Sequence, residues 1–196
     1  VVALDTGQNL IWGTQSIPLD QSQFAFTAGG MSPMGYAFPA AIGASFARNK
    51  GRAIAMIGDG GMQINIQELQ TLVYHRLPVA VFVMNNRSLG LIRQFTDQNF
   101  DGRNAATNED FGYSCPEFSK VAQAYGLPGF RISSEEELEA LMPEIMELNG
   151  PVVVDVVIDR TVDALPKLSV HQPVEEQEPY LPEAMFDELL VARHKP

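Results

Sequence analysis

The sequence of 196 residues contains one cysteine, Cys115, which excludes an internal disulfide and fits a reducing compartment. Basic residues are scarce: 13 lysines and arginines stand against 24 aspartates and glutamates, giving a net charge of −11. We therefore expect no nucleic-acid partner. The longest apolar run, Val79 to Met84, is far shorter than the roughly 20 residues of a membrane-spanning helix. Together these absences favour a globular protein of the cytoplasm, with no membrane association.

Other familiar signals are also missing. His75, His171 and His194 are scattered without the helical spacing of metal ligands, which disfavours a zinc site. No charged and then apolar segment at the start resembles a signal peptide. The sequence begins on a strand-like run, Val1 to Asp5, without an initiator methionine. We expect a domain cut from a longer polypeptide; removal of a leader or a missing start is the alternative.

Short β-branched runs alternate with amphipathic stretches along the first 160 residues. The predicted strands are Val1–Leu4, Phe24–Thr27, Ala53–Ile57, Val79–Met84, Gly129–Ile132 and Val152–Ile158. The three longest are almost continuously apolar, as in parallel strands buried on both faces. Helices are predicted over 36–48, 66–74, 117–125 and from a capping box at Ser133/Ser134 to Leu148. This alternation predicts a doubly wound α/β fold with a mostly parallel sheet flanked by helices on both faces.

The character of the chain changes after Asp159. Prolines interleave with acidic residues there, and only one short helix is predicted, from about Glu183 to Ala192. We therefore predict one domain over residues 1–160 and a proline- and acid-rich extension over 161–196 that packs on the surface of the domain.

Two of the predicted strands end in polar side chains. The strand Ala53–Ile57 leads into Gly58-Asp59-Gly60-Gly61, and the strand Val79–Met84 leads into Asn85-Asn86. Ligands of open parallel sheets bind beyond the carboxyl ends of the strands. If the two strands are neighbours, Asp59 and Asn86 meet there and offer oxygen ligands to Mg²⁺, which also takes phosphate oxygens and water.

The glycines beside Asp59 let the backbone approach a phosphate closely. A Gly-Asp-Gly-Gly turn by itself requires no ligand, and the segment lacks the third glycine of a dinucleotide-binding motif. A GDG triplet followed by an asparagine pair one strand–helix–strand unit later is far more restrictive.

This combination resembles the signature of thiamine diphosphate (ThDP) enzymes, and the surrounding sequence is similar to the acetohydroxyacid (acetolactate) synthase family over most of the chain. The segments that carry the resemblance are Gly7-Gln8, Gly29-Gly30, Met34-Gly35-Tyr36, Pro39 to Ala44, Asn65 to Leu69, Leu89-Gly90, Arg93-Gln94 and Phe100 to Arg103. The resemblance implies that the chain is the domain that binds the cofactor diphosphate.

The resemblance also assigns roles to residues. Mg²⁺ would be bound by Asp59, the Asn86 side chain and the Ser88 backbone carbonyl. Met34 would meet the aminopyrimidine ring, and Leu91 would hold the cofactor bent. Gly7, Gln8 and Asn9 would lie against the diphosphate, and the rest of the expected cofactor-binding set is Ser32, Gly58, Gly60, Gly61, Leu89 and Gly90.

No catalytic residue is assigned in this chain, because the activating glutamate of the family lies on a different domain. Glu68 is expected to support its own helix or its neighbours, and Cys115 is expected to be a structural thiol rather than a nucleophile.

The sequence departs from the family at several positions. Leu91 stands for the usual methionine and Phe95 for a frequent tryptophan. Asn9 replaces a common histidine, and Met31-Ser32-Pro33 replaces a more usual Leu-Gly-Thr. We expect cofactor bending to survive and the substrate preference to be altered.

The resemblance therefore implies decarboxylation of a 2-oxo acid such as pyruvate and its ligation to an acceptor. It also implies a pyrimidine-binding domain as partner, a homo-oligomer, and FAD as a possible further cofactor of the full-length enzyme. Three alternatives remain at this point: another ThDP-dependent decarboxylase or carboligase, an isolated cofactor-binding fragment without activity, and an unrelated Mg²⁺-dependent phosphate-binding protein.

Overall fold

The computed structural model describes residues 1–189. The chain divides into two compact units, Val1–Asp163 and Ala164–Pro196, each of which is described by itself. The sequence had placed this boundary at residue 160, and packing of the second unit on the first stays a prediction. Among residues 1–189, no helix has the length and apolarity needed to cross a membrane.

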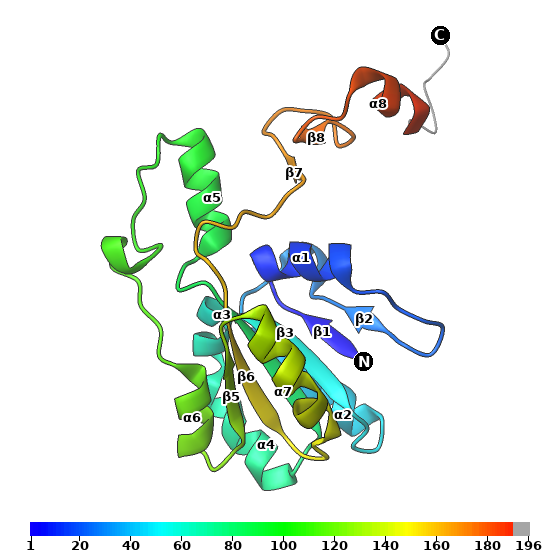
Figure 1. The fold of residues 1–196 in the computed structure, drawn as a ribbon, viewed down its shortest axis with the longest axis vertical. Coiled ribbons are helices and arrows are strands. Elements are labelled where there is room, and N and C mark those ends of the chain that lie inside the picture. The colour runs from blue at the N-terminus through cyan, green and yellow to red at the C-terminus, as the bar shows by residue number, and fades with distance from the viewer. Residues whose placement is uncertain (190–196) are drawn as a thin grey trace. The chain divides into compact units, whose positions relative to one another are not determined.

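The first unit is built on a six-stranded sheet (Figure 1). All of its strand pairs are parallel, and its order is β2-β1-β3-β4-β6-β5. The strands are β1 (Val2–Leu4), β2 (Ala25–Phe26), β3 (Ala53–Gly58), β4 (Val79–Asn85), β5 (Gly129–Ile132) and β6 (Val152–Val157). Each predicted strand forms, and the doubly wound α/β prediction is confirmed.

Seven α-helices connect these strands: α1 (Gln8–Ser16), α2 (Ala37–Ala47), α3 (Asp59–Ile64), α4 (Leu69–His75), α5 (Gly90–Asn99), α6 (Phe118–Ala124) and α7 (Glu135–Glu147). Short 3-10 turns cover Gly29–Met31, Ile66–Glu68 and Glu109–Phe111. The predicted cap of α7 forms, because the Ser134 hydroxyl accepts a hydrogen bond from the Glu137 amide. Thr71 donates to the Glu68 carboxylate at 2.8 Å, a local contact at the start of α4.

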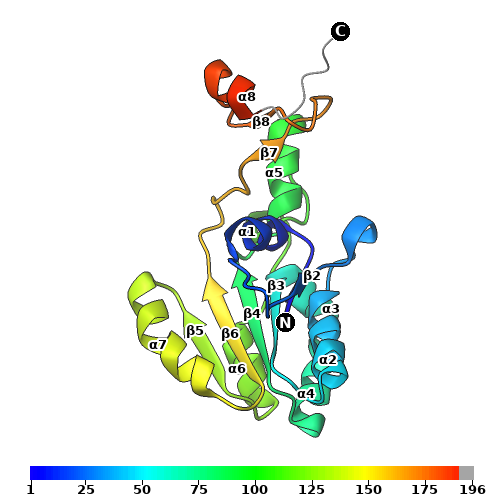
Figure 2. The ribbon, with the colours of Figure 1, turned by 90° about the vertical axis from the view of Figure 1, so that its right-hand side faces the viewer.

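The two faces of the sheet carry separate hydrophobic clusters. On one face Phe38, Leu72 and Phe118 bring α2, α4 and α6 against the strands. On the other face Ile145 of α7 packs with Val152 and its neighbours. In Figure 2 the strands lie between α7 on one side and α2 and α4 on the other. Burial on both faces accounts for the continuous apolar sequences of β4 and β6.

The connections of β1 and β3 leave the sheet toward opposite faces. Gly13 of α1 lies against Leu4 and Met56, on the face that α7 also covers, whereas α4 follows β3 on the opposite face. Adjacent strands whose connections diverge in this way leave a crevice beyond their carboxyl ends. The fold therefore places a ligand crevice at the ends of β1 and β3.

The second unit contains a short antiparallel pair, β7 (Lys167–Leu168) and β8 (Gln177–Glu178), which the sequence analysis did not predict. The helix α8 (Glu183–Leu189) follows, as predicted. The last residues of the predicted helix, 190–192, lie outside the described residues.

Candidate functional site

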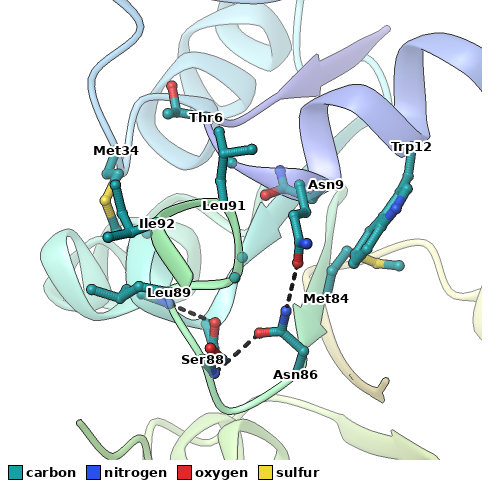
Figure 3. Close-up of a pocket in the computed structure, with 17 residues that line it drawn as sticks. Thr6, Asn9, Trp12, Met34, Met84, Asn86, Ser88, Leu89, Leu91 and Ile92 are labelled. Carbon is teal, nitrogen blue, oxygen red and sulfur yellow. Dashed lines mark hydrogen bonds between the residues drawn. The ribbon is translucent and has the colours of Figure 1, made fainter. Parts of the chain in front are cut away.

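A pocket opens at the carboxyl ends of β1, β3 and β4, where the crevice is expected (Figure 3). Thirteen of the fourteen predicted cofactor-binding residues line it: Gly7, Gln8, Asn9, Met34, Gly58, Asp59, Gly60, Gly61, Asn86, Ser88, Leu89, Gly90 and Leu91. They come from four separate stretches of the chain. The fold thus brings together residues that the sequence grouped only through a family resemblance.

Ser32 is the predicted residue that does not line the pocket. Its backbone is left-handed, with φ of 39°, and its carbonyl oxygen accepts a hydrogen bond of 2.6 Å from Thr6 Oγ1. Thr6 itself lines the pocket, so Ser32 acts on the pocket wall through Thr6. Its direct contact with a cofactor stays a prediction.

Four lining residues were not predicted: Thr6, Trp12, Met84 and Ile92. Their positions nevertheless follow from the fold. Thr6 and Met84 lie at strand ends, and Trp12 lies one helical turn after Gln8 on α1, so it shares a face with that residue. Trp12 and Ile92 could have been predicted from their spacing to other pocket residues if α1 and α5 had been recognised as helices.

Asp59 and Asn86 lie side by side because β3 and β4 are paired in register, with Gly58 opposite Met84. Both side chains are almost completely buried, at 2% and 5% exposed. The backbone amide of Ser88 donates to Asp59 Oδ2 and to Asn86 Oδ1, at 3.1 Å in each case. A carboxylate oxygen and an amide oxygen thus converge on one point of the turn after β4.

Burial dominates the electrostatics of Asp59 and raises the pKa of its carboxyl from 3.8 to about 6. Hydrogen bonds from the amides of Gly60 and Ser88, and from the side chains of Tyr113 and Cys115, offset part of this cost. A buried carboxylate with this pKa is stabilised by a bound cation. Among residues 1–189, no three histidine, cysteine, aspartate or glutamate side chains gather as a metal cluster. A cation here would therefore rest on one carboxylate and neutral oxygens, a set that suits Mg²⁺ completed by phosphate and water.

Gly60 forms part of the pocket wall, and a side chain at this position would have to displace two others. A Cβ atom at this position would stand 2.5 Å from Leu89 Cδ2 and 2.9 Å from Met34 Cε. Leu89 and Met34, two of the predicted cofactor contacts, therefore occupy the space that a side chain at residue 60 would take.

Asp5 does not line the pocket but holds one of its loops in place, a role that the sequence did not predict. Its fully buried carboxylate accepts hydrogen bonds of 2.9 Å from the amides of Gly35 and Ala37, at the start of α2. Burial raises its pKa, and these backbone donors counter the rise. Asp5 therefore fixes the loop that carries Met34 to the end of β1.

Asn9 links the ends of two strands. Its Nδ2 donates to the carbonyl of Asp5 at 2.9 Å and to that of Met56 at 3.4 Å. Because both contacts use the amide nitrogen, donation from Asn9 to a diphosphate would break one of them. The predicted role of Asn9 beside the diphosphate stays a prediction.

The two residues of the asparagine pair face different ways. Asn85 Nδ2 donates to Asp155 of β6 at 2.8 Å, and its Oδ1 accepts from the Arg87 amide and lies 3.4 Å from Cys115 Sγ. Asn85 thus shapes the turn that presents Asn86. Burial raises the pKa of Cys115 to about 12, which keeps its thiol protonated at neutral pH and makes it a poor nucleophile.

The pocket has a volume of about 100 Å³. Sites that enclose a small organic ligand usually measure roughly 300–1,000 Å³. These residues therefore provide one wall of a site for a molecule of cofactor size.

Comparison with known proteins agrees with this geometry. The family described as "Thiamine pyrophosphate enzyme, C-terminal TPP binding domain" matches residues 5–156. Among curated proteins, the acetolactate synthase isozyme 3 large subunit of Escherichia coli is 36% identical over 168 residues, which are 84% of this chain and 29% of that protein.

Two further relatives give the same result. The acetolactate synthase large subunit of Haemophilus influenzae is 34% identical over 84% of this chain and 28% of its own length. The probable acetolactate synthase large subunit of Methanocaldococcus jannaschii is 33% identical over 96% of this chain and 32% of its own length. The chain spans less than a third of the length of these relatives.

Proposed function

Because this chain belongs to the family of C-terminal thiamine pyrophosphate-binding domains of thiamine pyrophosphate enzymes, we propose that its pocket holds the ThDP diphosphate through Mg²⁺. The observation that carries the proposal is the convergence of Asp59 and Asn86 oxygens beyond β3 and β4. With the Ser88 carbonyl they would supply three protein oxygens, leaving room for two diphosphate oxygens and a water in an octahedral shell.

The remaining pocket residues bind and orient the cofactor. Gly60 leaves space for the side chains of Leu89 and Met34, and Leu91 and Met34 would present apolar surface to the organic rings. When bound, the cofactor would supply a carbon nucleophile and an acceptor for the electron pair released on decarboxylation of a 2-oxo acid. This chain contributes anchorage, a fixed geometry and exclusion of water around that chemistry.

At the level of the whole enzyme, the proposal is an acetolactate synthase-like activity on a 2-oxo acid such as pyruvate, followed by ligation to an acceptor. Its support is the set of acetolactate synthase relatives, of which this chain corresponds to less than a third. The activating glutamate would come from a pyrimidine-binding domain, in a homo-oligomer of the cytoplasm. FAD is proposed only for the remaining parts of the full-length enzyme.

Another ThDP-dependent decarboxylase or carboligase is the second candidate. Phe95 and Phe100 form an aromatic pair with ring centroids 5.9 Å apart, and their side chains are 41% and 48% exposed. An aromatic surface close to the pocket residue Ile92 is suited to a larger apolar substrate. Product analysis of the full-length enzyme with pyruvate and with bulkier 2-oxo acids separates the two candidates.

Calorimetric titration of the chain with ThDP in the presence of Mg²⁺ tests the cofactor proposal. We expect binding that is lost in Asp59→Ala and strongly weakened in Asn86→Ala. Equal binding by the wild type and both variants would show that the metal assignment is wrong. Acetolactate formation by this chain alone would contradict the part of the proposal that needs a second domain.

A further inference from the structure

An asparagine that binds a metal through its side chain must present its oxygen and not its nitrogen. The two ends of the amide are nearly equal in size but opposite in hydrogen bonding, since Oδ1 only accepts and Nδ2 only donates. Nothing in the shape of Asn86 selects one orientation. The selection must come from the groups that meet the other end of the amide.

In this structure that end of Asn86 meets Gln8. Asn86 Nδ2 donates to Gln8 Oε1 at 3.0 Å, which leaves Asn86 Oδ1 facing the Ser88 amide and the side of Asp59. The orientation of Asn86 therefore depends on the orientation of Gln8.

Gln8 is oriented in turn by two acceptors. Its Nε2 donates to Gln94 Oε1 at 3.1 Å and to the backbone carbonyl of Val162 at 3.3 Å. A carbonyl oxygen can only accept, so Val162 favours the same orientation of Gln8 as Gln94 Oε1 does. Gln94 is the closer of the two acceptors, and it lies on α5 outside the residues that line the pocket.

The series is shielded from water. Gln8, Gln94 and Asn86 are 4%, 1% and 5% exposed. Reversing one amide would place two donors or two acceptors face to face, without solvent to replace the lost hydrogen bond. Gly90 leaves the space that this contact needs, because a Cβ atom at that position would overlap both Gln8 Oε1 and Asn86 Nδ2.

We propose that Gln94 is a positioning residue of the magnesium site, which acts through Gln8 to keep the Asn86 amide oxygen directed at the metal. The inference rests on the proposed function, since it concerns the same Mg²⁺. It adds a residue that does not contact the cofactor pocket and gives Gln8 a purpose besides contact with the diphosphate.

The first test compares Gln94→Met with Gln94→Glu in the full chain. Methionine has a similar length but no acceptor oxygen, whereas glutamate keeps one. Mg²⁺ is titrated by calorimetry at saturating ThDP. We expect Gln94→Met to weaken Mg²⁺ binding about tenfold, as removal of groups behind a metal ligand commonly does. Gln94→Glu should stay within about threefold of the wild type. Unchanged affinity in Gln94→Met, or an equal loss in both variants, would overturn the proposal.

The second test is a double-mutant cycle with Asn86→Asp. A carboxylate has oxygen at both ends, so its orientation no longer matters. Gln94→Met should therefore cost about tenfold in Mg²⁺ affinity beside Asn86 and less than about twofold beside Asp at position 86. Equal costs in both backgrounds would mean that Gln94 acts only through general stability.

Gly90→Ala disturbs the contact between Gln8 and Asn86 directly, and it replaces Gln94→Met in the test if that variant fails to fold. It should show the same dependence on the residue at position 86, and thermal unfolding of each metal-free variant verifies its fold. If Gly90→Ala loses the same Mg²⁺ affinity in both backgrounds, orientation of Asn86 is not the cause. A wild-type chain that does not bind Mg²⁺ and ThDP would contradict the proposed function, whereas normal wild-type binding with unchanged variants contradicts only this inference.

Discussion

Replacing Asp59 with asparagine separates the stability of the fold from the binding of metal. The carboxylate is 2% exposed, and burial raises its pKa from 3.8 to about 6. A raised pKa means that the folded state favours the protonated form, so the stability linked to Asp59 is complete below the unfolded pKa and is lost as the pH rises through about 6. At neutral pH the metal-free fold therefore carries the cost of an ionised buried group, which asparagine removes.

The size of the effect follows from the shift. A pKa that is about two units high corresponds to about 3 kcal/mol above pH 6. Asp59 accepts from the amides of Gly60 and Ser88, whereas asparagine has one oxygen and can satisfy only one of them. The lost hydrogen bond offsets about 1 kcal/mol. We therefore expect metal-free Asp59→Asn to be about 2 kcal/mol more stable than the wild type at pH 8, and unable to bind Mg²⁺.

Urea unfolding in EDTA measures this difference. The gain should be about 2 kcal/mol at pH 8 and close to 0.5 kcal/mol at pH 5, where Asp59 of the folded wild type is mostly protonated. Glu144→Gln is a matched control, because it removes a negative charge from an exposed position on α7. Its effect on the free energy of unfolding should stay within about 0.5 kcal/mol at both values.

A variant that is less stable than the wild type at pH 8 would refute this reasoning, as would a gain that does not depend on pH. The first result would mean that the hydrogen bonds to Asp59 outweigh its burial, and the second that the pKa of its carboxyl is not raised.

Three other predictions follow from the same geometry. Because protons compete with Mg²⁺ for Asp59, Mg²⁺ affinity should be constant above pH 6 and fall about tenfold per pH unit below it. The single tryptophan, Trp12, lines the pocket, so its fluorescence can follow the Mg²⁺ titration, with a correction for protonation of the diphosphate. An Mg²⁺ affinity that does not change with pH would contradict the assignment of Asp59 as a metal ligand. Asp5→Ala leaves two buried amides at the start of α2 without their acceptor, so urea unfolding should show a loss of about 2–4 kcal/mol; a loss below about 1 kcal/mol would mean that this cap is dispensable. Gly60→Ala would displace the flexible side chains of Leu89 and Met34, two predicted cofactor contacts, so ThDP binding should weaken at least about tenfold while thermal unfolding changes little. Unchanged affinity would contradict the predicted contact of these two side chains with the cofactor.

The sequence predicted the sheet well because its strands are buried on both faces. The apolar runs of β4 and β6 leave little choice of structure, and each predicted strand formed. It missed α1 and α5 for the opposite reason. The buried positions of α1 are Gln8, Asn9 and Gly13, and those of α5 are Gly90 and Gln94, so large apolar residues do not form the buried face of either helix.

Those two helices carry several residues of the site, and the residues that were not predicted include some of these. Trp12 and Ile92 lie on them, and the contacts of Gln94 with Gln8 join residues 86 positions apart. The role of Asp5 could not be predicted either, because nothing in the sequence indicates that its carboxylate caps a helix more than 30 residues later. A resemblance identifies residues that meet the ligand more readily than residues that hold them in place.

The most direct test of the account is a crystal structure of the chain with ThDP and Mn²⁺, which replaces Mg²⁺ and is located by its anomalous scattering. We expect a metal ion bound by an oxygen of Asp59, Oδ1 of Asn86 and the carbonyl of Ser88, at roughly 2.0–2.2 Å, with two diphosphate oxygens beside it. A metal or diphosphate bound away from the ends of β3 and β4, or a metal shell without Asn86, would contradict the account.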